Sequence, residues 1–530
     1  MLQTHPAASG FPNRDGGRFP KAICFSDGLG KPATVTAHTL RKRSARTSGR
    51  LKTNNMNAKK ILGYALGPLG SAAFGLLSLP LISWYFPAED IGRIVLLQTI
   101  AGLSILLLGL GLDQSYIRDY YAVKDKAALF KSVFLSPLIL TVAVVVLVLL
   151  INASWPSEII FDIPSTNLGI LFLIFLATTL ITRFLALILR MKEQALAFSV
   201  SQLAPKFLIL VLVFAVIASG LPANTTSLVF AYTAAQVLTV VLLIYQLRQD
   251  LQAVSHAKWS SELHRDGLRY GLPLAFGNLA YWGLTSIDRF VLKNISGLDE
   301  LGIYSMAVSF GAVALIFQSV FSTIWAPLVF KWVEEKTNLD KIGGITLSMT
   351  VLISAMICLI GIFSPMATWI LPEKYTQVQF ILLSCMLFPL FYTLTEVSGI
   401  GLNVVRSTWL ITVINIVAFI ANAALLYLLV PKFGAKGAAM ASATAFWLFF
   451  IFKTEFSSRL WQPLPRLKIY TNSTLCLMIC LAYTWLGTRD NYIWFALAWA
   501  VGLGFLFLKY KHALFAATEK IKAKLNRSAK

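Results

Sequence analysis

Apolar residues dominate the chain from residue 58 to residue 510, in long runs with few charges inside them. A helix needs about 20 consecutive apolar residues to cross the hydrocarbon core of a bilayer. Runs of this length, bounded by charged residues, Gly or Pro, predict about fourteen transmembrane helices. Their predicted limits are 61–86, 91–113, 132–151, 168–190, 198–219, 226–246, 267–292, 300–331, 341–363, 377–402, 407–429, 435–456, 467–487 and 491–509.

The composition agrees with this pattern. Hydrophobic residues make up 57% of the 530 residues and charged residues only 13%, whereas soluble domains average about 25% charged residues. The fold class predicted is therefore an all-α, polytopic membrane protein. Five cysteines, four of them inside apolar runs, give no disulfide framework.

The basic residues set the predicted orientation and account for the net charge of +22. With the N-terminus in the cytoplasm and the spans alternating, the inward segments after residue 58 hold 27 Lys and Arg, and the outward segments hold six. Cytoplasmic loops of membrane proteins carry such an excess. We expect both termini to be cytoplasmic and no nucleic-acid partner.

The first 57 residues are polar, rich in Gly, Pro, Ser and Arg, and lack an apolar period, which predicts a disordered basic tail. Met56 stands just before the first span and resembles a natural start, so an upstream extension without function is the first interpretation. A tail that touches anionic lipid and a cleaved transit peptide are the alternatives. A second basic cytoplasmic tail is predicted at 511–530.

The spans fall into two groups of six, with a weak internal repeat. The predicted parts are a bundle at 58–250, a cytoplasmic linker at 251–266, a bundle at 267–458 and two additional helices at 459–510. The first bundle opens with GYALGPLGSA and its first outer crossing reads PAEDIGRIVLLQTI; the second opens with RYGLPLAFGN and crosses at GLDELGIYSMAVSF. Gly92 thus matches Gly302, and repeats of this kind are the usual construction of secondary transporters.

Three short motifs in these regions resemble a known family. They are SIDRFVLKNISGLDELGIYSMA, IWAP at 324–327, and VPKFGAKGAAMASA at 430–443. Together, in this order, they are similar to the polysaccharide-transporter (Wzx-type O-antigen flippase) branch of the multidrug/oligosaccharidyl-lipid/polysaccharide exporters, over about 58–510. The resemblance implies a V-shaped pair of six-helix bundles around a central cavity, with the last two helices outside it.

The resemblance also implies a function. The substrate would be a lipid-linked oligosaccharide carried across a bacterial inner membrane, and the expected partners are membrane lipids, a polysaccharide polymerase and chain-length machinery. No nucleotide-binding G-x-x-x-x-G-K-[ST] and no metal-binding H-E-x-x-H occur. The longest outward loop, 152–167, is too short for an outer active site. We therefore expect no enzyme, no cofactor and no metal.

Charges inside spans are costly and need a reason, since insertion scales give about 2.5–3.5 kcal/mol for a central Arg or Lys. Arg183 lies seven residues before Arg190, about 10 Å from the inner end of its span at 1.5 Å per residue. Lys206 lies about 12 Å from the same side. Glu396, seven residues before Asn403, is again about 10 Å deep.

The matched depths favour a site for the pyrophosphate of a lipid-diphosphate sugar. Arg183 would offer a planar fork and Lys206 a mobile point charge. Glu396 would pair with them to close an inner gate, or carry a coupling proton. In the alternative interpretation the two cations reach to the interface, and Glu396 is a structural partner of the backbone or of Arg406.

Other charges have less specific interpretations. Asp288 and Arg289 lie near the outer end of the seventh span, and neighbours on a helix do not face each other; they would lock the halves or line the cavity. Arg118 and Arg269 lie at inner ends of spans, where they are interface charges in the first interpretation; in the alternative they would guide an anionic headgroup inward. Sugars are held by aromatic, amide and hydroxyl groups, for which the candidates within spans are Tyr64, Gln98, Asn278, Tyr281, Trp282, Gln318, Trp325, Tyr392, Asn415 and Asn422. In the alternative interpretation, these aromatic and amide residues within spans are packing or helix-contact residues.

Three functions follow in order of preference. The first is a flippase for lipid-linked oligosaccharide, with lipid II or teichoic-acid precursors as open substrates. The second is a cation-coupled multidrug antiporter of the same superfamily, which expects twelve spans and an acid low in the first half. The span 61–86 holds no acid, and the excess charge within spans is basic. The third is a membrane scaffold for polysaccharide assembly that transports nothing.

Overall fold

The computed structural model describes the backbone of residues 58–528 and, apart from Pro68, the side chains of residues 66–510. The predicted tail 1–57 and the candidate Tyr64 side chain lie outside the described residues, as do the side chains of 511–530. Helices make up this part of the chain, and it contains no strand. The prediction of an all-α membrane protein is confirmed.

The helices of the first half and the linker are α2 (Ala58–Tyr85), α3 (Ala88–Leu108), α4 (Leu112–Asp119), α5 (Lys126–Asn152), α6 (Trp155–Phe161), α7 (Thr166–Met191), α8 (Ala195–Ala218), α9 (Thr225–Gln246) and α10 (Arg248–His256). Those that follow are α11 (Ser261–Ser296), α12 (Leu298–Phe310), α13 (Ala312–Glu334), α14 (Lys341–Phe363), α15 (Met366–Ile370), the 3₁₀ turn η1 (Glu373–Tyr375), α16 (Val378–Ser398), α17 (Ile400–Val404), α18 (Thr408–Leu460), α19 (Arg466–Leu486) and α20 (Tyr492–Ser528).

Eleven of the described helices are long and apolar enough to cross a membrane. One of them, α18, joins two predicted spans across Gly434, whose φ of 53° and ψ of −129° are not helical. Taking α18 as two segments and adding α2 and α11 to the eleven gives fourteen. Within the described residues, however, α2 counts only as a shorter apolar helix, Leu69–Tyr85, and α11 is not among the eleven. The count of fourteen therefore stays a prediction.

Polar residues before several spans fix where the helices begin. The side chains of Asp125, Ser165, Asn224 and Ser260 accept hydrogen bonds from backbone N–H groups in the first turns of α5, α7, α9 and α11. Such caps satisfy donors that have no partner within the helix. Helices α7 and α9 begin within two residues of the predicted limits, whereas α5 and α11 each begin six residues earlier than predicted.

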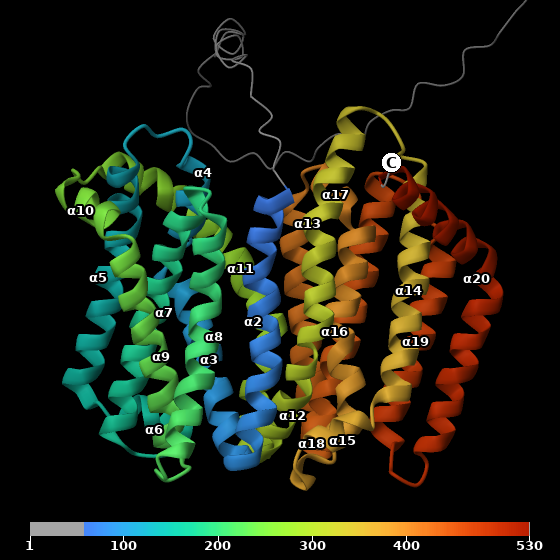
Figure 1. Ribbon diagram of the computed structural model, residues 1–530, viewed down its shortest axis with the longest axis horizontal. Coiled ribbons are helices and arrows are strands. Elements are labelled where there is room, and N and C mark those ends of the chain that lie inside the picture. The colour runs from blue at the N-terminus through green and yellow to red at the C-terminus, as the bar shows by residue number, and fades with distance from the viewer. Residues whose placement is uncertain (1–57, 529–530) are drawn as a thin grey trace, which may run out of the picture. The chain divides into compact units, whose positions relative to one another are not determined.

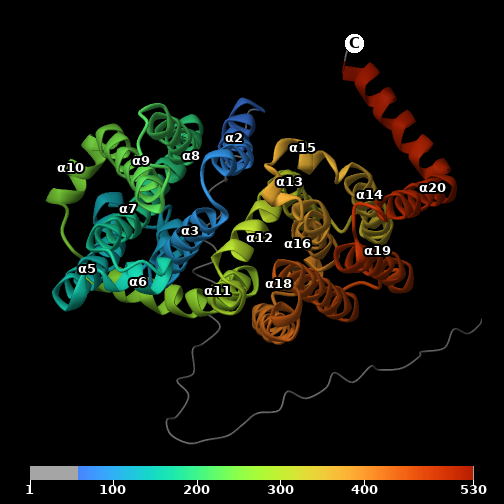
Figure 2. The ribbon, with the colours of Figure 1, turned by 90° about the horizontal axis from the view of Figure 1, so that it is seen from below.

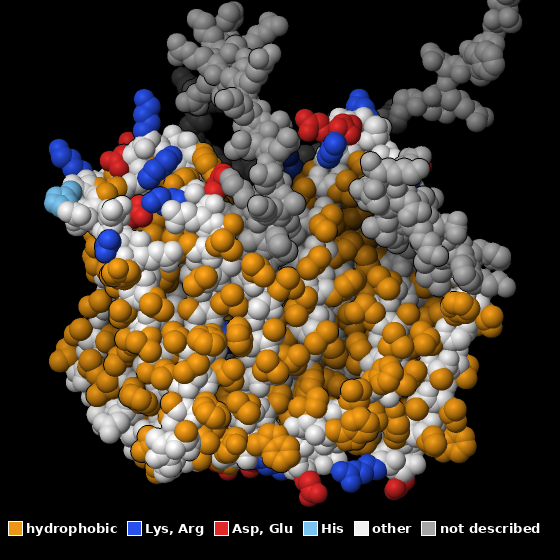
Figure 3. Space-filling view, viewed as in Figure 1, with side chains coloured by type: hydrophobic (Ala, Val, Ile, Leu, Met, Phe, Trp, Pro, Cys, Tyr) orange, Lys and Arg blue, Asp and Glu red, His pale blue; other side chains and the backbone are white. Residues whose placement is uncertain are grey.

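The helices form two groups beside each other (Figures 1 and 2). One contains α5, α7, α8 and α9, the other α13, α14, α16 and α18–α20, and α2, α3, α11 and α12 lie where the groups meet. Within the second group α16 is almost wholly buried and packs against α12, α13, α14, α18 and α19. Apolar side chains cover the middle of the visible face, and charged ones gather at its two ends (Figure 3).

In each half of the repeat an acidic residue stands two positions before the matching glycine: Asp90 before Gly92, and Glu300 before Gly302. Asp90 accepts a hydrogen bond from the Thr225 hydroxyl at the start of α9. Its counterpart Glu300 accepts one from the Ala435 backbone N–H, at 2.7 Å, where the second part of α18 begins. Each acid therefore holds the start of the last span in its own half.

Helix α3 of the first half crosses helix α12 of the second half at the two matching glycines, Gly92 and Gly302. A Cβ on Gly92 would lie 2.5 Å from the Leu298 carbonyl oxygen, and one on Gly302 would lie 2.1 Å from that of Ala88. Because backbone atoms stand in the way, only glycine permits this approach of α3 and α12.

Helix α11 packs against both halves. Near its beginning, the Gly267 carbonyl accepts a hydrogen bond from the Ser115 hydroxyl of α4 at 2.7 Å, and His264 bonds the Ser132 carbonyl of α5 at 3.0 Å. Beyond Pro273, the Leu284 carbonyl accepts one from the Asn422 amide of α18 at 3.0 Å. The helix predicted to open the second half thus begins on the surface of the first.

Candidate functional site

A cavity of about 320 Å³ lies where α2 and α3 of the first half meet α11 and α12 of the second. Its lining combines hydroxyl groups, an amide, an indole and a guanidinium with a few apolar side chains. The lining residues are Leu79, Val95, Gln98, Thr99, Gly102, Trp282, Ser286, Arg289, Ser305, Val308 and Ser309. This is the mixture of flat aromatic and hydrogen-bonding groups that suits a polar ligand with ring faces.

Lys206 approaches this cavity from α8. Its Nζ donates to the Gln98 Oε1 at 3.2 Å, and Gln98 lines the cavity. Among the residues that the structure describes, no carboxylate lies within 4.0 Å of this ammonium group. A half-buried cation inside a span without an acidic partner is costly, and an anionic ligand would relieve that cost.

Arg289 brings a second cation to the cavity, from the other half. Its Nη1 donates to the Thr285 carbonyl at 2.7 Å and to Asp288 Oδ1 at 3.2 Å. Asp288 is buried and also accepts a hydrogen bond from the Tyr304 hydroxyl. The expectation that Asp288 and Arg289 do not face each other is wrong, because the long Arg289 side chain turns back along its own helix. The cavity therefore has one neutralised cation and one cation without an acidic partner.

Arg183, the other predicted phosphate ligand, does not line this cavity. Its Nη2 lies 2.8 Å from Asp113 Oδ2 on α4, and the Arg183 side chain is 40% exposed. Asp113 also accepts a hydrogen bond from the Gln114 amide at 2.8 Å. Arg183 and Lys206 thus have separate partners, and the structure does not join them into one site.

Glu396 contacts neither predicted cation. Its Oε2 accepts a hydrogen bond from the Ser322 hydroxyl of α13, Tyr392 lies within hydrogen-bonding reach, and the cation acting on it is Lys453 of α18. The ring of Tyr281 on α11 lies 5.7 Å from that of Tyr392, between centroids. These five residues form a polar cluster inside the second half, here named the Glu396 cluster.

Lys453 was missed by the sequence analysis. It lies three residues before the predicted end of its span at 456, so it was counted with the cytoplasmic cations. The three cavity serines, Ser286, Ser305 and Ser309, were also missed. Serine is common in membrane helices and no spacing distinguished them.

The remaining predicted residues lie elsewhere. Arg118 is paired with Asp119 at 2.7 Å, and its guanidinium lies 4.1 Å from the ring centroid of Tyr270 on α11. Arg269 and Asn278 are exposed on α11. Trp325 is buried in a small core beside Phe321, and its indole N–H has no hydrogen-bond partner. None of these four predicted residues lines the cavity.

Several contacts join the halves at the end of the bundles that holds α6, α12 and α15 (Figure 1). The Trp84 indole donates to the Ile370 carbonyl at 3.0 Å, and the Lys374 ammonium donates to that of Phe86 at 2.8 Å. Lys293 of α11 lies 2.8 Å from Asp162, which follows α6. With the crossing of α3 and α12, these contacts close the end opposite α10.

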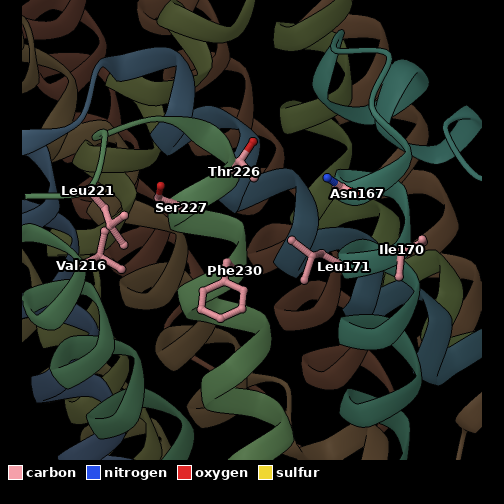
Figure 4. Close-up of a pocket in the computed structure, with 8 residues that line it drawn as sticks. All are labelled: Asn167, Ile170, Leu171, Val216, Leu221, Thr226, Ser227 and Phe230. Atoms are coloured by element: carbon pink, nitrogen blue, oxygen red, sulfur yellow. The ribbon is translucent and has the colours of Figure 1, made fainter. Parts of the chain in front are cut away.

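A second cavity, of about 440 Å³, lies among α7, α8 and α9 within the first half. Figure 4 shows Phe230 between the α7 side chains Ile170 and Leu171 and the pair Val216 and Leu221. No charged side chain lines it. It is therefore less suited to a polar or anionic ligand than the cavity between the halves.

Comparison with known proteins identifies the family. The model of the polysaccharide biosynthesis protein family matches residues 58–333, more than half of the chain. The chain belongs to the polysaccharide biosynthesis protein family. The family predicted from the three motifs is thus confirmed.

One relative in sequence and two solved structures are similar to this chain. The chain is 24% identical over 238 residues to a protein of Shigella flexneri named "Putative O-antigen transporter"; the match covers 43% of this chain and 54% of the relative, about half its length. The structure resembles the lipid II flippase MurJ in an inward closed conformation, with a TM-score of 0.64, 15% identity and coverage of 86% and 99% of the two chains.

An inward-facing multidrug resistance transporter of the MATE family, in the MOP superfamily, resembles it with a TM-score of 0.53, 16% identity and coverage of 77% and 95%. At these identities the structural likenesses establish a shared fold. The chain therefore has the fold of MOP-superfamily transporters.

Proposed function

We propose that this protein is a flippase that carries a lipid-diphosphate-linked oligosaccharide across a bacterial inner membrane by alternating access. The observation that carries the proposal is the polar cavity between the halves, which Lys206 approaches without an acidic partner and Arg289 lines. Relatives named as an O-antigen transporter and a lipid II flippase support the same class of substrate.

Electrostatics give the cavity a selective role. A pyrophosphate leaving water must exchange its hydration for other donors, since an unpaired charge in an apolar medium is strongly disfavoured. Lys206 supplies a positive charge, and the bound anion would offset the free-energy cost of burying that charge without an acidic partner. Arg289, already held by Asp288, has guanidinium N–H groups left to donate. Trp282 and the cavity serines are suited to sugar rings and hydroxyls.

The two ends of the bundles would open in turn. Contacts such as Lys374 to Phe86 must break for release at the α6 end. At the α10 end, the exposed Arg118 and Arg269 would draw in the anionic headgroup. Arg183 would take part only if a phosphate displaced Asp113 from it.

The Glu396 cluster would couple transport to an ion gradient. Its carboxylate and the Lys453 ammonium are inside the second half, together with the hydroxyls of Ser322 and Tyr392. Protonation of Glu396 would leave Lys453 without its counter-charge, and the helices α13, α16 and α18 would rearrange. The coupling ion in this step is a proton.

Replacement of Glu396 by Gln tests the coupling. The amide can still accept from Ser322, so the protein is expected to fold and insert normally, while transport in proteoliposomes loses its response to an imposed pH gradient. Glu373→Gln, at an exposed carboxylate of η1, is the matched control and should keep that response. An undiminished response in Glu396→Gln would remove this residue from the coupling step.

The function itself is tested by complementation. The full chain is expressed in a strain that lacks its own O-antigen flippase, and surface polysaccharide is measured beside the pool of lipid-linked repeat units. We expect restored polymer and a drained pool. An intact, inserted protein that leaves the pool full across several glycan types would contradict the proposal, and drug-efflux assays would then test the antiporter alternative.

A further inference from the structure

A third cavity lies far from the one between the halves, at the seam where α18 ends and α19 begins. It measures about 520 Å³ and is lined by Glu455, Pro465, Arg466, Leu467, Lys468 and Tyr470. The seam joins the second half to the two additional helices, and it lies at the α10 end of the bundles (Figure 1). By the distribution of Lys and Arg this is the cytoplasmic side.

The cations of the seam outnumber its acid. Glu455 Oε1 accepts from Arg459 Nε at 2.7 Å and from Arg466 Nη1 at 2.6 Å, and its Oε2 accepts from the Tyr470 hydroxyl at 3.0 Å. In the described part of the chain no carboxylate lies within 4.0 Å of Lys468. Arg459 and Arg466 thus share one carboxylate and Lys468 has none, which leaves an excess of two positive charges.

The unused donors point to a phosphate ligand. A guanidinium has five N–H donors, and Arg459 and Arg466 both approach the same oxygen of Glu455. Their side chains are 67% and 46% exposed, so the remaining donors are accessible. Phosphate oxygens match the geometry of such donors well.

Apolar side chains stand beside these cations. Leu467, between Arg466 and Lys468, is 81% exposed, and Leu460 at the end of α18 is 51% exposed. A cationic rim next to exposed leucines at the end of a span fits a molecule with a phosphate head and a hydrocarbon tail. Basic pockets between membrane helices on the cytoplasmic side bind anionic lipid headgroups.

We propose that the seam between α18 and α19 binds an anionic phospholipid of the leaflet on the α10 side, with its phosphate on Arg466, Arg459 and Lys468. The lipid bridges the second half and the two additional helices. The site is separate from the transport cavity, so it does not depend on the proposed function.

Lipid binding to the purified full-length protein tests the proposal. Native mass spectrometry and thermal unfolding are carried out with phosphatidylglycerol and with phosphatidylcholine of the same acyl chains. We expect a saturable phosphatidylglycerol site that phosphatidylcholine does not occupy. Arg466→Gln with Lys468→Gln removes two charges and should weaken phosphatidylglycerol binding about tenfold or more.

Two further variants make the result specific. Arg489→Gln makes the same chemical change at an exposed cation beyond the other end of α19 and should leave binding unchanged. Glu455→Gln removes the competing carboxylate and should strengthen binding. Equal binding of both lipids, wild-type binding by the double variant, or occupation by a polyprenyl diphosphate but not by phosphatidylglycerol would each overturn the proposal.

Discussion

Lys206→Gln is expected to leave the protein folded and to reduce surface polysaccharide at least tenfold in the complementation assay, with lipid-linked repeat units accumulating. The substitution is expected to favour folding and to impair transport, and both effects come from the loss of the same charge. The ammonium group is half-buried without an acidic partner, so its removal lowers the cost of folding. The same removal takes away the charge that an anionic headgroup would meet, and tenfold corresponds to about 1.4 kcal/mol.

Two other substitutions separate charge from shape. Lys206→Arg keeps the charge and should retain part of the transport. Lys331→Gln, at a cation 66% exposed on α13, should transport as the wild type does. Wild-type polymer from Lys206→Gln at normal expression would exclude Lys206 from the substrate site.

Gly302→Ala is expected to lower the thermal unfolding midpoint in detergent by several degrees and to impair transport. The new Cβ would lie 2.1 Å from the Ala88 carbonyl oxygen, so α3 and α12 would have to separate. Overpacking of this kind costs about 1–3 kcal/mol. Since the crossing closes the α6 end, a shift of α12 would also disturb that closure.

Glycines in open surroundings provide the control for this substitution. An added Cβ on Gly504 of α20 would meet nothing within 4 Å. Gly504→Ala should therefore unfold at the wild-type temperature. If Gly302→Ala and Gly504→Ala behave alike, the halves do not approach each other as closely as described.

Hydropathy was sufficient for the fold because the bilayer demands long apolar helices. It could not locate breaks within apolar segments. The span predicted at 91–113 ends as α3 at Leu108, and Gly111, with φ of 68°, precedes α4. The span predicted at 300–331 is divided into α12 and α13 at Gly311. A glycine at such a break changes the direction of the chain without changing the hydropathy around it.

The site was less predictable because it depends on partners distant in the sequence. Depth within a span placed Arg183 and Lys206 at one level, but Asp113, 70 residues before Arg183, holds that guanidinium in an ion pair. Gln98, 108 residues before Lys206, directs the ammonium towards the cavity. Nothing in one-dimensional spacing distinguishes these two environments.

The double attachment of α11 has a consequence for synthesis. Chains leave the ribosome from the N-terminus, and early domains usually fold first. Here the surface of α4 and α5 that receives Gly267 and His264 stays uncovered until α11 has been translated and inserted. A ribosome stalled before Ser261 would therefore present an incomplete first bundle to the quality-control proteases of the membrane. Helix α11, the seventh predicted span, therefore completes the packing of the first bundle.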